Sequence, residues 1–159
     1  MNYLITFRTY GTWLHGDERG TVDARHNVVG TPLLENLPNW RNQARKQMKG
    51  ERVILDATQR ECVAATLREV ANFRGWILHA LAVQTNHVHA VVGADCTPEK
   101  VMNDWKSYAT RRLRERELVP QSIPIWSQHG STRYLKTYAS FIAACQYVTE
   151  HQVDLSDCP

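Results

Sequence analysis

The sequence predicts an α+β fold: a ferredoxin-like βαββαβ arrangement with an antiparallel sheet, helices on one face and one extra C-terminal helix. Apolar, β-branched runs and amphipathic segments follow one another in the order β, long loop, α, β, β, α, β, α. Two of the expected strands are separated by only three residues, which is typical of neighbouring antiparallel strands. The 159 residues, 43% of them apolar, suit a single domain over 1–159 with its own core.

The first strand is expected at 3–9, an apolar run with aromatic and β-branched residues. A segment rich in Gly, Asp, Asn and Pro follows at about 15–57, with one short helix expected at 39–49. Such a long connection is unusual inside a compact domain, so we interpret it as a functional loop or a family-specific insertion.

The first long helix is expected at 58–74, where Thr58 and Glu61 fit a capping box and Gly75 ends the helix. A second helix should begin at Thr97, followed by Pro at the first helical position. The other elements are strands at 76–83 and 87–92, helix two to about 117, a polar strand region at 124–135, and a third helix at 138–152.

Charge and hydropathy narrow the classes of protein. The net charge of +3 and pI of about 8.7 permit nucleic-acid binding but do not require it. A mean hydropathy of −0.45 and the lack of a long apolar run exclude a membrane span, and no signal peptide is expected. No cysteine pair has C-x-x-C spacing, so we expect reduced thiols in a cytoplasmic protein at Cys62, Cys96, Cys145 and Cys158.

Two histidines in the third expected strand are candidate metal ligands. Side chains alternate in a strand, so His87 and His89 share one face at a spacing of about 6.6 Å. The other face, which carries Asn86, Val88, Ala90 and Val92, should meet the helix-packed core. Two imidazoles placed this way can converge on one ion, although a solvated pair of strand histidines would give the same pattern.

The last helix places a tyrosine and a further histidine together. At 100° per residue, Phe141, Cys145, Val148 and Gln152 form its core face. Tyr147 is then the one bulky residue among small side chains, with His151 one turn beyond it. A half-buried aromatic residue and a surface histidine near a helix end would look the same.

These motifs together resemble the single-domain tyrosine transposases of the IS200/605 type and their REP-associated relatives, within the HUH endonucleases. TNHVHAVV is similar to the histidine strand of that family, YLITFRTYGTW to its first strand, and QYVTEHQ to its catalytic helix. The resemblance covers residues 3 to about 152.

The resemblance implies that Tyr147 cleaves single-stranded DNA and leaves a 5′-phosphotyrosine link and a free 3′-OH, which can later rejoin strands. A phenol is a weak nucleophile at neutral pH, so a metal ion that polarises the phosphate would help. Mg²⁺ or Mn²⁺ is implied by the family, whereas imidazole ligands alone would favour softer ions. His87, His89 and His151 would bind the metal. Relatives often carry an amide four residues after Tyr, where this chain has His151, and Gln152 is the less favoured third ligand because it lies five residues after Tyr147, out of helical phase.

Basic residues are candidates for contacts with DNA phosphates. One set lies in the long segment, and a second set lies mainly on the second long helix. The alternative for the second set is an ordinary solvated helix face without a role in DNA binding. The candidates are Arg41, Arg45, Lys46, Lys49, Arg52, Lys106, Arg111, Arg112 and Arg133. Trp105 and Tyr108 are expected in the core rather than as base platforms, and Trp126 and His129 could flank the site.

The expected partners are single-stranded DNA with a hairpin and a second copy of the chain in a homodimer. Two other functions use the same residues or the same fold. One is a nickase like those of replication initiators or relaxases, and the other is a non-catalytic DNA-binding protein derived from a transposase.

Overall fold

The computed structural model describes residues 1–11 and 52–153, and of 151–153 only the backbone. The expected helix at 39–49 and the candidates Arg41, Arg45, Lys46 and Lys49 lie outside the described residues. The predicted order of strands and helices is confirmed. The elements are β1 Asn2–Arg8, α2 Ala57–Arg74, β2 Ile77–Val83, β3 His87–Gly93, α3 Pro98–Glu115, β4 Ser131–Leu135 and α4 Tyr138–Val153.

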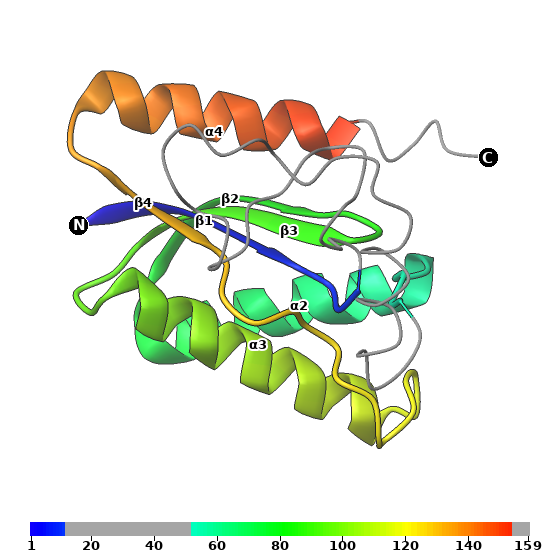
Figure 1. Cartoon of the computed structure of the whole chain (residues 1–159). Helices are drawn as coiled ribbons and strands as arrows, with labels where there is room; N and C mark the ends of the chain where they lie inside the picture. The colour runs from blue at the N-terminus through cyan, green and yellow to red at the C-terminus, as the bar shows by residue number, and fades with distance from the viewer. Residues whose placement is uncertain (12–51, 154–159) are drawn as a thin grey trace, which may run out of the picture.

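The four strands form one antiparallel sheet in the order β2-β3-β1-β4. Figure 1 shows α2 and α3 side by side below the sheet and α4 above it. The α+β ferredoxin-like prediction is therefore confirmed, with the helices of the βαββαβ unit on one face. The extra C-terminal helix covers the opposite face, so the sheet lies between two helical layers.

The main core lies between the sheet and the α2–α3 layer. Ile5, Phe7, Val88 and Val92 are fully buried in it, because alternate residues of β1 and β3 point to this face. Trp105 of α3 is also fully buried, and its Nε1 donates to the carbonyl of Leu67. The expectation that Trp105 belongs to the core is correct.

A smaller cluster joins α4 to the other face of the sheet. Val148 of α4 is fully buried there, with Phe141 and Cys145 packed around it, as the helical phase predicts. The sheet contributes Ala, Val and Leu side chains to this cluster. The fully packed members of this cluster are Ala82, Val91, Leu135, Ala144 and Val148.

The start of α2 differs from the prediction. Asp56 is the N-cap, and the capping box is formed by Asp56 and Gln59 rather than by Thr58 and Glu61. The helix ends at Gly75, as predicted, because Gly75 adopts a left-handed conformation with φ 74°.

The described end of the long segment is part of the core. Val53 and Leu55 are buried, and their backbone N–H groups donate to the carbonyls of Tyr10 and Thr85. Residues 52–56 thus connect the end of β1 to the β2–β3 turn. Within the described residues, no helix is long and apolar enough to cross a membrane.

Candidate active site

His87 and His89 lie side by side on the face of β3 that α4 covers. Their ring centroids are 4.6 Å apart with an interplanar angle of 73°, which confirms that the two side chains share one face. His89 is buried, at 7% exposure, while His87 is half-buried. The pair is therefore partly covered by the protein and partly accessible to solvent, with His87 the more accessible of the two.

Each imidazole has a hydrogen-bond partner at Nδ1. Thr6 Oγ1 of β1 is 2.8 Å from His89 Nδ1, and Asn86 Oδ1 is 2.6 Å from His87 Nδ1. The prediction that the Asn86 side chain points to the core is wrong, because its amide oxygen turns to the histidine ring instead. Thr6 was not predicted as a site residue. Strand alternation puts it on this face, but the register that pairs it with His89 depends on tertiary structure.

The donor set fits a divalent metal ion. With Nδ1 engaged by an oxygen, Nε2 of each ring is the nitrogen that a metal would use. Among the described side chains, no group of three or more His, Cys, Asp or Glu residues could hold a metal. The side chains of His151 and Gln152, the predicted third ligands, lie outside the described part of the chain.

Tyr147 projects from α4 toward the histidine pair. Its ring centroid is 5.3 Å from that of His89, at an interplanar angle of 73°. The tyrosine is 43% exposed. The helix and the histidine strand of one chain are therefore sufficient to bring the predicted nucleophile to the predicted metal ligands.

An open groove begins beside this pair. Arg8 lies opposite His87 across the β1–β3 ladder, and both Thr6 and Arg8 line a cavity of about 530 Å³. The segment 127–131 forms the other wall, and it includes His129. That His129 flanks the active site stays a prediction.

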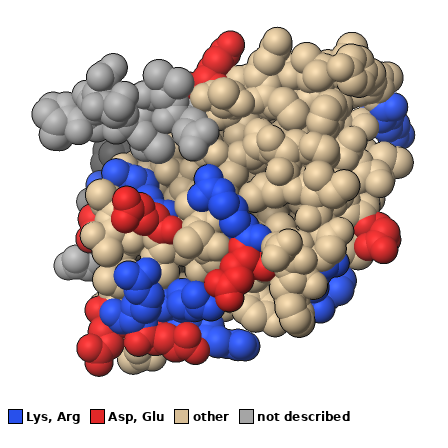
Figure 2. Space-filling model, turned by 180° about the vertical axis from the view of Figure 1, so that it is seen from behind, with Lys and Arg blue, Asp and Glu red and all other residues tan. Residues whose placement is uncertain are grey.

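The predicted DNA-contacting residues are spread over several surfaces. Arg133 of β4 is exposed on the same sheet face as Leu135, the face that α4 covers. Arg52 is exposed before α2. Arg112 instead lies on the α2–α3 side, where both of its terminal nitrogens bond Glu69 at 3.2 and 3.3 Å. From behind (Figure 2), Lys and Arg alternate with Asp and Glu on the lower half of the molecule, while its upper right carries few charges.

The two remaining cations, Lys106 and Arg111, lie on α3. The Lys106 ammonium donates to the carbonyls of Ser127 and His129, and burial lowers the pKa of Lys106. The Arg111 guanidinium lies over the ring of Tyr108, 5.2 Å from its centroid.

The family model described as "Transposase IS200 like" matches residues 46–150, about two thirds of the chain. The chain belongs to the IS200-like transposase family. The match includes the histidine strand and Tyr147, and it starts inside the long segment. This transposase matches no curated protein.

Two solved structures resemble the transposase. One is a REP-associated tyrosine transposase bound to a REP hairpin, with a TM-score of 0.57, 12% identity, and coverage of 99% of this chain and 73% of that one. The other is a Deinococcus radiodurans protein assigned as a transposase, with a TM-score of 0.50, 16% identity, and coverage of 95% and 90%. At these identities the likeness supports the fold.

Proposed function

We propose that this transposase cleaves and rejoins single-stranded DNA through a covalent link to Tyr147. The observation that carries the proposal is the position of the Tyr147 ring, whose centroid is 5.3 Å from that of His89. A nucleophile needs this kind of adjacency, because the reacting phosphate must touch both the hydroxyl and the group that stabilises its charge.

In the proposed reaction, Tyr147 Oη attacks the phosphorus of one phosphodiester. The bond from phosphorus to the 3′ oxygen breaks, so that a 5′-phosphotyrosine and a 3′-OH are formed. The phenol loses its proton, and the leaving 3′ oxygen gains one from solvent. Attack of a 3′-OH on the phosphotyrosine reverses these steps and joins strands without ATP.

His87 and His89 would hold the divalent ion, expected to be Mg²⁺ or Mn²⁺, and His151 is the proposed third ligand, with Gln152 as the alternative. Such an ion would supply Lewis-acid polarisation of the phosphate. Thr6 and Asn86 orient the two rings through Nδ1.

The proposed substrate is single-stranded DNA that carries a hairpin. Arg52 and Arg133, together with the candidates in the long segment, remain predicted phosphate contacts. The pairing of Arg112 with Glu69 instead favours the alternative of a solvated helix face for that residue. A homodimer and a single domain over 1–159 also remain predictions.

The proposal is tested with single-stranded oligonucleotides that contain hairpins and carry a label on the 3′ side of possible cut sites. We expect a labelled protein adduct with Mn²⁺ or Mg²⁺, and its loss with a chelator or in Tyr147→Phe. Tyr138→Phe is the matched control, because Tyr138 is an exposed tyrosine near the start of the same helix.

No adduct with the unmodified protein, or an adduct that persists in Tyr147→Phe, contradicts the proposal. Tight hairpin binding that ignores both the chelator and Tyr147→Phe, without any cleavage, would instead identify a non-catalytic DNA-binding protein. Cleavage confined to a replication or transfer origin would identify a nickase.

A further inference from the structure

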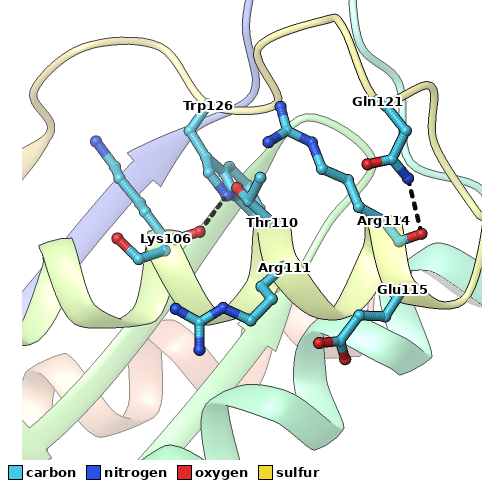
Figure 3. A pocket seen from close by; sticks show the side chains of 8 residues that line it. Lys106, Thr110, Arg111, Arg114, Glu115, Gln121 and Trp126 are labelled. Atoms are coloured by element: carbon cyan, nitrogen blue, oxygen red, sulfur yellow. Dashed lines mark hydrogen bonds between the residues drawn. The ribbon is translucent and has the colours of Figure 1, made fainter.

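A second open cavity lies on the outer side of α3, against the segment that leads to β4. Its volume is about 600 Å³. Figure 3 shows Lys106 and Arg114 on either side of Trp126, with Arg111 reaching out from the same helix. All three basic residues belong to α3 and line this cavity, which we call the α3 pocket.

The positive charge of the α3 pocket is not balanced by carboxylates. Lys106 donates to two neutral carbonyls, and Arg114 Nη2 donates to the carbonyl of Ile123 at 3.0 Å. Arg114 Nε is buried without a hydrogen-bond partner. The one acidic lining residue, Glu115, is turned to Arg112 at 3.7 Å. Among the described residues, Arg111 has no ion pair either.

Hydrogen bonds and a ring contact hold the walls of the α3 pocket in place. Trp126 Nε1 donates to the carbonyl of Lys106, and the Trp126 ring packs edge-on against Phe7 at 4.9 Å. Gln121 Nε2 donates to the carbonyl of Arg114. A preformed cationic pocket with hydroxyl and amide groups on its walls suits a phosphate oxygen better than an apolar ligand.

The α3 pocket and the candidate active site share a boundary. Lys106 binds the carbonyls of Ser127 and His129, the segment that also walls the groove beside Thr6 and Arg8. Ser127 N–H and Oγ both donate to the carbonyl of Arg8, the residue at the ladder position opposite His87. The segment 127–129 therefore lies between the α3 pocket and the groove lined by Thr6 and Arg8.

We propose that the α3 pocket binds a backbone phosphate of the DNA outside the cleavage site. Arg111 and Arg114 make the contact, and Trp126 forms the wall. That the nucleic acid is DNA rests on the proposed function, whereas the phosphate chemistry rests on the pocket itself. A backbone phosphate carries no base identity, so this contact strengthens binding for every sequence.

Two neighbouring arginines provide the test. Arg111→Gln removes a pocket cation, and Arg112→Gln removes a cation of the same helix that is already paired with Glu69. Binding of hairpin DNA is measured with a chelator present, over a series of salt concentrations. For Arg111→Gln we expect several-fold weaker binding at each salt concentration and a salt slope smaller by about 0.7 to 0.9. Arg112→Gln should leave both close to those of the unmodified protein.

A charge of opposite sign gives the second variant. Ser107 is exposed and lines the pocket, so Ser107→Glu should weaken binding at least as much as Arg111→Gln. Unchanged unfolding temperatures show that both variants fold. Equal effects of Arg111→Gln and Arg112→Gln, or wild-type binding by Ser107→Glu, overturn the proposal.

Inorganic phosphate distinguishes the two sources of the ligand. If it stabilises the unmodified protein but Arg111→Gln still binds DNA normally, the pocket takes free phosphate only and the proposal fails. At saturating DNA, Arg111→Gln should still form the Tyr147 adduct. An adduct missing from the unmodified protein as well would contradict the proposed function and not the α3 pocket.

Discussion

The imidazole of His89 is oriented from the neighbouring strand. Thr6 Oγ1 lies 2.8 Å from its Nδ1, and His89 is buried between the sheet and α4. An oxygen partner at Nδ1 fixes the direction of Nε2, and where that oxygen accepts from Nδ1–H it also leaves the lone pair on Nε2. His87 is oriented in a similar way, because its Nδ1 lies 2.6 Å from Oδ1 of Asn86, the residue directly before it.

Thr6→Val removes this hydroxyl while nearly keeping the shape of the side chain. We expect the affinity for Mn²⁺ to fall by about 10- to 100-fold, because a histidine that lacks its oxygen partner is less well oriented. Isothermal titration calorimetry measures the affinity, and ¹⁵N chemical shifts of the imidazole report its tautomer.

Thr132→Val is the control for this change. Thr132 faces the other side of the sheet, where its hydroxyl donates to Glu99. An unchanged Mn²⁺ affinity in Thr6→Val, with an unchanged tautomer of His89, would show that Thr6 does not position the ring.

At the scale of elements, the segment before β4 passes very close to β1. A Cβ added at Gly130 would lie 2.6 Å from the Thr6 carbonyl oxygen and 2.6 Å from Met102 Sδ. The methionine can move aside, but the carbonyl belongs to the strand backbone. Only glycine lets the segment that walls the active-site groove approach the sheet this closely.

Gly130→Ala should therefore lower the free energy of unfolding by about 1–3 kcal/mol, the usual cost of overpacking. Urea denaturation measures it. Ser131→Ala, at the exposed next residue, should change the stability by less than about 0.5 kcal/mol. If the two variants have equal free energies of unfolding, the close approach at Gly130 does not limit the size of the side chain there.

The helices and strands were predictable wherever local patterns are strong. Gly75 and Thr97 mark a helix end and a helix start in both the sequence and the structure. The N-cap of α2 was predicted two residues late, because Thr58 and Asp56 both begin a capping pattern and the choice depends on packing. Gln59 completes the box and also donates to the Leu118 carbonyl, a contact that no local pattern reveals.

At the scale of the whole molecule, the sheet separates a packing face from a chemical face. The first is filled by α2 and α3, and the second carries His87, His89 and, from α4, Tyr147. Strand alternation and helical phase predict which side chains share a face. They cannot predict the strand register that brings Thr6 and Arg8 to the histidines, or the α3 pocket, since both depend on how distant segments pack.

We predict that a single chain assembles both halves of the proposed site, because the Tyr147 ring lies 5.3 Å from His89 of the same chain. The direct measurement mixes two inactive variants, His89→Gln and Tyr147→Phe, and assays adduct formation on hairpin DNA. A site built within one chain predicts that the mixture stays inactive, since every intact tyrosine sits beside a damaged metal site. Recovery of the adduct in the mixture would contradict the claim and show that the tyrosine helix acts on a partner.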